Sequence, residues 1–451
     1  MRLVLGTLLA AGLATAVCAE DAETARLREL AAKEKQQELM DLPSRVSALE
    51  KKAEKADGRI SLKDGLKFKS DDGNFTAHVG GRYVGHYRWH MERPDTSRAA
   101  VDSFYTRQAK LETSGTFMKQ FEYKAQLNMA SATATWGRTR LDDGYVGWTK
   151  IPELSIRFGQ FKEPFSQEEL CSTRFIDFVE RSVLNRLVPG RDIGVMIHGS
   201  VEKNLFEYAL ALYNGSGQNT DDVNDEKDLC IQLRTTPFAG TDMGYLKGLR
   251  LGVAGTFGDA DNASIGALDF TTTELQVQFM DATTGNLDSL QTRLGVELSY
   301  LYGPMSLRAE YIVRNNKVDA GSNDDEKIKV DGWYVAGTYL LTGETKALEN
   351  RVKPDAPLDL DGGGFGAVEL AARIAQLKVS DDIFDLGVAS AATNADKVTT
   401  ITVGVNWWLW NNFRFSPNFI YEKYSEDILS SRHVDPTNKA LGMLFRVQAD
   451  F

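Results

Sequence analysis

The chain has 451 residues, of which 42% are hydrophobic and 25% charged, and its formal net charge is −11. This composition excludes a disordered chain. Apart from an N-terminal stretch, no apolar run approaches the roughly 18 residues that a membrane-crossing helix needs. The acidic balance also argues against a nucleic-acid-binding protein, which would need a basic surface to neutralise phosphates.

The first segment predicts export. A basic residue precedes an apolar run at residues 3–17, and Val17 and Ala19 place small residues at the −3 and −1 positions of a cleavage site. A lipoprotein signal with Cys18 as the lipidated residue is the alternative, but Val17 fits that signal poorly. We therefore predict a cleaved signal peptide at residues 1–19.

Residues 20–60 have a helical pattern. They are rich in Ala, Glu, Lys, Leu and Arg, and apolar side chains recur from Leu39 onward in alternating steps of three and four residues. Pro43 suits the first turn of a new helix. The pattern predicts a helix at about 22–40 and a short coiled coil at about 43–57. Such a segment could be a solvated helical spacer or a trimerising stalk.

From residue 61 to Phe451 the period of the pattern changes to two. Apolar and polar residues alternate in 121–129, 294–300 and 305–313, and a short turn at 303–304 joins the last two segments. A period of two predicts β-strands with one apolar and one polar face. Further segments of this kind lie at 249–257, 275–279, 333–341, 368–376, 399–409 and 413–423.

Loop lengths and the C-terminus favour a membrane barrel over a soluble sandwich, which also alternates. Tight turns alternate with long acidic loops such as 220–228, as in outer-membrane barrels. Counting back from Phe451, every second residue is apolar, which resembles the signal that hands Gram-negative barrels to their assembly machinery. The length fits about 16 strands of roughly 10–12 residues around a water-filled channel. We predict an all-β fold, a transmembrane antiparallel β-barrel of 16 strands over residues 61–451.

Several ordered motifs lie along the barrel segment. They are Gly80-Gly81-Arg82, Gly159 to Phe165, Val188 to Gly194, Gly332 to Glu344, and Gly404-Val405-Asn406-Trp407. Together they resemble one family, the phosphate-selective porins O and P. The resemblance covers nearly the whole barrel and implies a trimeric, 16-stranded outer-membrane barrel narrowed by loops folded into the pore. It implies that residues from Glu163 to about Ile193 form the main constriction loop.

Alternation places a mixed set of charges in the lumen. On the first predicted strand, Arg82, His86, Arg88 and His90 share the polar face, and rings of like charge set pore selectivity. The two histidines lie about 13 Å apart in a strand, too far apart to share a metal ion. The same parity selects Lys110, Lys124, Arg157, Arg293, Arg308 and Arg314, but also Glu112, Glu122, Glu297 and Glu310.

The resemblance implies specific pore residues. Phosphate-specific members of the family line the pore with an arginine ladder and a lysine cluster. Arg82 and Arg107 match two ladder positions, and Asp142 matches a lumen carboxylate near the phosphate site. Strict alternation would nevertheless send Arg107 toward lipid unless a β-bulge reorients it. The candidate pore-lining and anion-binding residues are Arg82, Arg107, Lys124, Asp142 and Arg157.

The chain also departs from the phosphate-specific pattern. Thr106 stands where the ladder has an arginine, and Glu122 and Glu169 stand where the cluster has lysines. The loop at 258–272, which would deliver further arginines, contains none. A glutamate in place of a lysine would repel a bound phosphate at close range.

No catalytic motif, cofactor fingerprint or ordered metal-ligand spacing occurs, so we expect neither an enzyme nor a bound metal or cofactor. Cys171 and Cys230 could pair in an oxidising compartment, but we expect them to be incidental.

The leading hypothesis is a homotrimeric porin in a Gram-negative outer membrane, in contact with membrane lipids and lipopolysaccharide. It would pass small hydrophilic solutes, including anions such as phosphate. The alternatives are a weakly selective porin without a phosphate site, a barrel enzyme, for which His198 has no evident partner, and a non-conducting structural tether.

Overall fold

The computed structural model describes residues 60–62, 65–93, 101–130, 139–202, 205–222, 224–259, 265–319, 326–428 and 437–451, with single positions between 29 and 47. The chain divides into two units, residues 1–60 and 61–451, which are described separately.

In the first unit, Glu29 and Lys33 are helical, and their side chains form an ion pair of 2.7 Å. The predicted signal peptide and most of the predicted coiled coil lie outside the described residues. Within the described part of the chain, no helix has the length and apolar character that crossing a bilayer would require.

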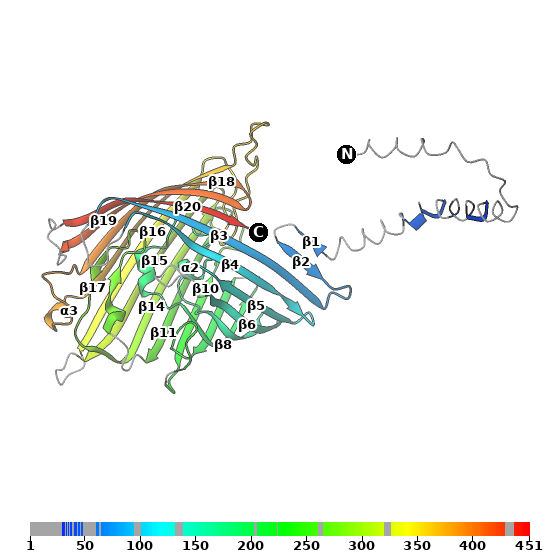
Figure 1. The fold of residues 1–451 in the computed structure, drawn as a ribbon. Coiled ribbons are helices and arrows are strands. Elements are labelled where there is room, and N and C mark those ends of the chain that lie inside the picture. The colour runs from blue at the N-terminus through cyan, green and yellow to red at the C-terminus, as the bar shows by residue number, and fades with distance from the viewer. Residues whose placement is uncertain are drawn as a thin grey trace, which may run out of the picture. The chain divides into compact units, whose positions relative to one another are not determined.

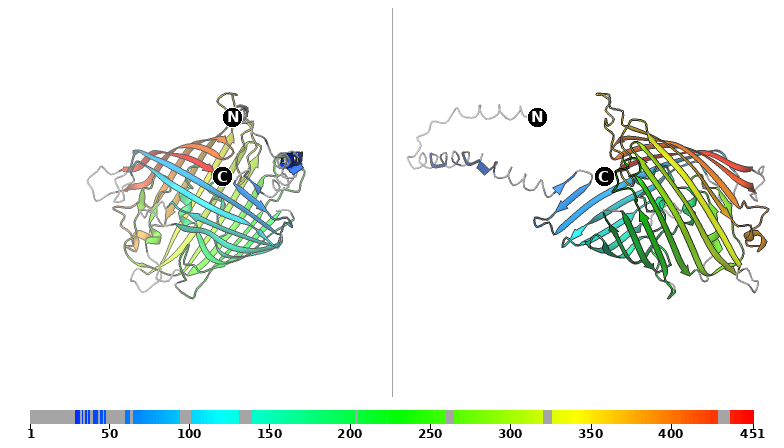
Figure 2. Two further views of the ribbon diagram at one scale, coloured as in Figure 1. Left: turned by 45° about the vertical axis from the view of Figure 1, so that its right-hand side comes forward. Right: turned by 180° about the vertical axis from the view of Figure 1, so that it is seen from behind.

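The second unit is a closed antiparallel barrel of 16 strands, as predicted (Figures 1 and 2). The wall runs from β3 to β11 and from β14 to β20, and it closes where β20 pairs with β3. The short β2 pairs with the beginning of β3. The strands are β1 (Ile60–Ser61), β2 (Leu66–Lys69), β3 (Phe75–Glu92), β4 (Ser103–Phe117), β5 (Phe121–Asn128), β6 (Arg140–Ile151), β7 (Leu154–Lys162), β8 (Arg191–Val201), β9 (Phe206–Tyr213), β10 (Asp228–Thr235), β11 (Leu249–Asp259), β12 (Phe270–Thr271), β13 (Gln278–Met280), β14 (Asn286–Tyr302), β15 (Met305–Asp319), β16 (Glu326–Leu340), β17 (Ala367–Val379), β18 (Lys397–Trp410), β19 (Phe413–Ile428) and β20 (Thr437–Asp450). Loops carry the α-helices α2 (Gln167–Leu170) and α3 (Asp382–Asp385) and the 3-10 helices η1 (Val183–Leu187) and η2 (Ile265–Leu268).

In this wall apolar side chains face outward and polar side chains face inward, which is the reverse of a soluble barrel. Along β15 the apolar residues Met305, Leu307 and Tyr311 are exposed, whereas Ser306 and Arg308 face inward and are buried. The predicted alternation is therefore present, with the apolar side outward. An outward apolar band is what a membrane barrel presents to lipid.

The height of the wall varies around the barrel. Strands β5, β9 and β10 have eight residues each, whereas β14 has 17 and β19 has 16. The strands of the low wall lie next to one another in the sheet, from β5 to β10. The strands from β14 to β20 form a tall wall.

Two loops fold into the barrel and fill part of the lumen. Phe178 and Leu184 belong to the loop between β7 and β8, and Phe270 and Phe279 belong to the loop between β11 and β14; all four are buried in one hydrophobic core. The core also includes inward-facing wall residues such as Ile420 of β19.

One expected strand is not part of the wall. Segment 275–279 was predicted to be a barrel strand, but it lies in the inward-folded loop between β11 and β14. Its alternating apolar residues Leu275, Val277 and Phe279 are buried in the lumen core instead of facing lipid. A short alternating run thus indicates that one face is apolar, but it does not show whether lipid or the protein core covers that face.

The strand pairing leaves no space for a side chain at Gly115, because a Cβ there would lie 1.9 Å from the main-chain oxygen of Thr76 on β3. We expect Gly115→Ala to lower the free energy of unfolding by roughly 1–3 kcal/mol, the range of overpacking substitutions. Gly255→Ala is the matched control, since its nearest neighbour would be 3.6 Å away, on Phe257. Urea unfolding in lipid vesicles measures both, and equal midpoints for the two variants would contradict the expectation.

Candidate functional site

The loop between β7 and β8, residues 163–190, crosses the lumen and is here called the pore loop. Its main chain is held by guanidinium groups from the opposite wall. Arg446 on β20 donates hydrogen bonds to the carbonyl oxygens of Thr173 and Val179, and Arg414 on β19 donates to that of Ile176 at 2.8 Å. Buried carbonyl groups need hydrogen-bond partners, so these arginines compensate for the loop's removal from water.

Ion pairs hold the acidic side chains of the pore loop. Asp177 lies 2.6 Å from Lys346 and 3.7 Å from Arg308, and Glu168 lies 3.0 Å from Arg373. All these partners belong to the tall side of the barrel or to the segment that follows β16. The loop is therefore attached to the tall wall by its main chain and by its carboxylates.

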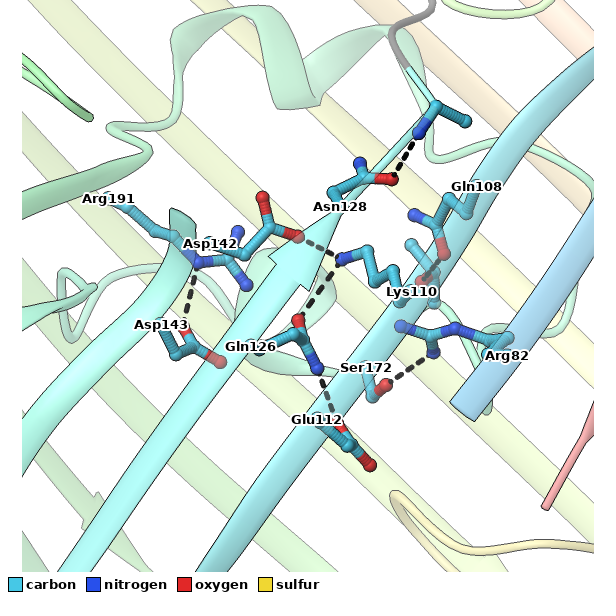
Figure 3. A network of polar contacts seen from close by, with 12 residues as sticks. Arg82, Gln108, Lys110, Glu112, Gln126, Asn128, Asp142, Asp143, Ser172 and Arg191 are labelled. Carbon is cyan, nitrogen blue, oxygen red and sulfur yellow. Dashed lines mark hydrogen bonds and ion pairs between the residues drawn. The ribbon is translucent and has the colours of Figure 1, made fainter. Parts of the chain in front are cut away.

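An open cavity of about 710 Å³ lies on the other side of the pore loop, against β3 to β8. Figure 3 shows some of its charged side chains, among them Arg82, Lys110 and Asp142, which come from β3, β4 and β6. Eight basic side chains and five acidic ones line it. These are Arg82, Arg107, Lys110, Lys124, Lys162, Arg174, Arg181 and Arg191, with Glu112, Glu122, Asp142, Asp143 and Glu169.

A β-bulge turns Arg107 into the lumen. On β4, Gln108 pairs with Val84 and Thr106 with Gly85, so Arg107 is the extra residue. Arg107 Nε lies 2.7 Å from Glu180 Oε1 of the pore loop. Strict alternation would have sent this side chain toward lipid, and the bulge removes that difficulty.

A second bulge brings two neighbouring aspartates inward. On β6, Asp143 pairs with Gln126 while Leu141 pairs with Leu127, which leaves Asp142 as the extra residue. Asp142 pairs with Lys110, and Asp143 lies 2.7 Å from Lys124 and 2.7 Å from Arg191. These charges form two adjacent groups across β4, β5, β6 and β8, and Figure 3 shows the Lys110–Asp142 and Arg191–Asp143 pairs.

Sequence reasoning missed Asp143 and Arg191. The signal available was the pair of adjacent acids at 142–143, which breaks the alternation of β6. Arg191 carries no such signal, because it lies at the junction of the pore loop and β8. Only the closed barrel shows that these residues meet.

Two carboxylates of the pore loop, those of Glu169 and Glu180, are paired with cations. Burial alone would raise the pKa of Glu180, but the Arg107 guanidinium beside it lowers this pKa to about 2. Burial likewise opposes ionisation of Glu169, whose pKa is lowered to about 2 by Arg181 and Lys162. Both side chains are therefore negatively charged at neutral pH.

The structure brings four of the five predicted site residues together. Arg82, Arg107, Lys124 and Asp142 line the cavity. Arg157 faces an adjoining cavity of about 450 Å³, which shares Lys124, Asp143 and Lys162 with the first. Arg157 pairs with Glu122 at 2.8 Å, so the glutamate that departs from the phosphate-specific pattern neutralises a neighbouring cation.

Arg82 differs from the other basic side chains of the cavity. Among the described residues, no carboxylate lies within 4.0 Å of its guanidinium, whereas each of the other seven cations has such a partner. Its Nη1 donates to Ser172 Oγ at 3.0 Å, and its Nε is buried without a partner. The cavity thus contains one uncompensated cation.

Among the described residues, Ser155 and His198 do not form a nucleophile–base pair. Ser155 is opposite His198 across β7 and β8, but its hydroxyl donates to the carbonyl oxygen of Ile151, and His198 Nε2 has no partner among the described residues. Cys171 and Cys230 are buried and unpaired. In the described ranges, no group of three His, Cys, Asp or Glu side chains is placed to hold a metal ion.

Comparisons with known proteins agree with this geometry. The family described as "Phosphate-selective porin O and P" matches residues 79–451. Porin O of Pseudomonas aeruginosa is 23% identical over 387 residues, which cover 82% of this chain and 87% of that protein. Among solved structures, OmpF of Salmonella typhi in complex with daunomycin (13% identity, TM-score 0.53) covers 85% of this chain and is itself covered completely. An anion-selective porin from Comamonas acidovorans (13% identity, TM-score 0.50) covers 84% of the chain and is also covered completely.

We expect the Arg107–Glu180 ion pair to help hold the pore loop in place. Glu180→Gln removes the charge that pairs with the partly buried Arg107 guanidinium, and losing a hydrogen bond to a charged group costs about 1.5–3 kcal/mol. We expect a lower free energy of unfolding and more frequent brief closures in single-channel recordings. Glu122→Gln is the control, because Glu122 also pairs with an arginine but is 25% exposed and lies on the wall. Identical recordings for Glu180→Gln and wild type would show that this pair does not hold the loop.

Proposed function

The chain belongs to the phosphate-selective porin O and P family, and from this premise we propose that its pore passes small hydrophilic solutes with a preference for anions. The family and the barrel make it an outer-membrane porin. The preference for anions is supported by the charges along the cavity beside the pore loop.

One observation carries this proposal. Basic side chains outnumber acidic ones in the cavity by eight to five, and in the described part of the chain no carboxylate lies within 4.0 Å of the Arg82 guanidinium. A lining with an excess of one charge favours ions of the opposite sign, because the low-dielectric wall screens the charges poorly. Ions in solution screen such charges, so the preference for anions is expected to weaken as ionic strength rises.

The same pairing pattern argues for weak binding of phosphate. Lys110 forms an ion pair with Asp142, and Lys124 and Arg191 both form ion pairs with Asp143. A phosphate in the cavity would have to compete with these fixed carboxylates for the same cations. We therefore favour a channel that conducts anions over a site that retains phosphate.

The low wall supports assembly into a homotrimer. A strand of eight residues is about 26 Å long, and when tilted by about 40° it spans about 20 Å, less than the roughly 25 Å of a membrane barrel's apolar band. Strands β5, β9 and β10 thus suit contact with another subunit better than contact with lipid. One of the similar structures, OmpT of Vibrio cholerae, is described as a trimer form (12% identity, TM-score 0.50, 84% of this chain and 99% of that chain).

The rival hypothesis of a non-conducting tether has less support. The two adjoining cavities share Tyr145 and Leu170 in addition to their charged residues, so the open space continues along β5 to β7. A tether would gain nothing from a charged passage beside a docked loop. The coiled coil at about 43–57 stays a prediction.

The experiment is the reversal potential of single channels under a potassium chloride gradient. Wild type is expected to prefer chloride, and Arg82→Gln to reduce the permeability ratio of chloride over potassium by up to about five-fold. This figure corresponds to about 1 kcal/mol for one unit charge at 4 Å in water. Arg140→Gln is the control, since Arg140 is exposed and lies outside the cavity.

Titration with phosphate completes the experiment. The chloride current should persist when phosphate is present at a comparable concentration. Block at low phosphate concentration would show a retained phosphate site and overturn the weak-binding part of the proposal. A cation preference in wild type would overturn the whole proposal.

A further inference from the structure

Lysines form a row along the outward face of four neighbouring strands. Lys378 on β17 is directly opposite Lys397 on β18, and Lys423 on β19 is directly opposite Lys439 on β20. Lys423 pairs with Thr399, two positions along β18 from Lys397, so the two pairs are diagonal neighbours. These four residues are here called the lysine row.

The lysine row lies at the loop end of the tall wall. Each lysine is within three residues of the point where its strand meets the loop 380–396 or the loop 429–436, except Lys423, which is five residues from the end of β19. Outer-membrane barrels carry their longer loops on the outside of the cell and their short turns on the periplasmic side. The row is thus expected at the level of the outer leaflet's headgroups.

Apolar side chains continue below the row on the same face. Ile374 of β17, Ile401 of β18 and Phe419 of β19 are outward-facing and 38%, 43% and 38% exposed. Each lies four residues from the lysine of its own strand, which keeps the parity that points to the outside. The outer surface therefore passes from basic to apolar within a few residues.

The direct opposition of like charges is unfavourable in an isolated barrel. Side chains opposite each other in an antiparallel pair are about 4.5–5.5 Å apart, and like charges at this distance destabilise the sheet. Compensation is partial. Asp381 and Asp396 each lie 3.8 Å from Lys378, and Glu92 lies 3.1 Å from Lys439.

The two middle lysines have no such compensation. Within the described parts of the chain, neither Lys397 nor Lys423 has a carboxylate within 4.0 Å. An anion placed over the row would contact both. The energetic conflict in the sheet thus indicates a negatively charged group supplied from outside the barrel.

We propose that the lysine row binds the phosphorylated headgroup of a glycolipid in the outer leaflet, whose acyl chains lie on the apolar surface below. The combination of a cationic line above an apolar face matches a lipid that carries phosphate at its polar end. Basic clusters next to the apolar part of a membrane protein recognise anionic lipid headgroups in this way.

The one-sided placement agrees with a specific lipid contact. At the loop end of β4, β5 and β14 the outward residues are apolar: Phe104 is 84% exposed, Met129 is 51% exposed and Leu290 is 50% exposed. On β15 and β16 of the tall wall, Lys317, Lys327 and Lys329 extend the basic surface beside the row. The lysine row belongs to the tall wall, which has the height to span the bilayer. No lysine of the row belongs to the low wall, which is proposed above as the subunit contact.

The test uses the full-length protein in detergent with bisphosphorylated lipid A as the probe. The dissociation constant is measured for wild type, for K397Q/K423Q and for K67Q/K69Q. The last variant removes the same charge from two exposed lysines of β2, at the turn end of the barrel. K397R/K423R keeps the charge and serves as the conservative variant.

We expect K397Q/K423Q to weaken lipid A binding at least ten-fold, while K67Q/K69Q and K397R/K423R bind like wild type. Dephosphorylated lipid A should bind wild type much more weakly than the phosphorylated form. Single-channel conductance of K397Q/K423Q should equal that of wild type, which shows that the barrel is folded and keeps this test independent of the pore.

Three results would overturn the proposal. Wild-type binding by K397Q/K423Q would show that the row is not the site. Equal binding of phosphorylated and dephosphorylated lipid A would show that acyl contacts alone hold the lipid. Displacement of lipid A by an equal concentration of inorganic phosphate would assign the row to the free ion instead of the lipid.

Discussion

The structure depends on a polar loop that is buried inside a polar wall. When a chain segment is removed from water, its main-chain groups need other hydrogen-bond partners. Inside this barrel Arg414 and Arg446 donate hydrogen bonds to carbonyl oxygens of the pore loop. The wall can supply such donors because polar and charged side chains, including Arg414 and Arg446, stand on its inward face. A soluble barrel with an apolar interior would have nothing to offer the carbonyl groups of the loop.

This attachment determines where the passage lies. The pore loop is held to the tall wall, and its apolar side chains fill the space between them together with the loop from β11 to β14. The open space is left on the opposite side, against β3 to β8. The arginines of the barrel therefore act in two ways. Arg414 and Arg446 hold the main chain of the loop, whereas Arg107 lines the passage and also pairs with Glu180 of the loop. Glu122 and Glu169 reduce the positive excess without reversing it.

Sequence reasoning recovered the parts of the fold that depend on a repeating pattern. The period of two, the alternation of turns and loops, and the amphipathic end of the chain predicted the 16-stranded barrel. Most events that break the pattern escaped it. Segment 275–279 alternates like a strand but packs in the lumen, and the bulge at Asp142 follows only from pairing between strands. At Arg107 the conflict between alternation and the family resemblance did indicate a bulge. Arg191 meets Asp143 only because the barrel closes around them. No local pattern encodes these long-range contacts.

The central claim is that ions pass between the pore loop and the wall formed by β3 to β8. Cysteine accessibility tests it most directly, in a background with Cys171 and Cys230 replaced by serine. Ser172→Cys places a thiol on the cavity side of the loop, and Val183→Cys places one in the packed half, where Val183 is fully buried. A negatively charged methanethiosulfonate reagent should reduce the current of the first variant and leave that of the second unchanged. Loss of current in Val183→Cys alone would place the passage on the other side of the loop and contradict the account.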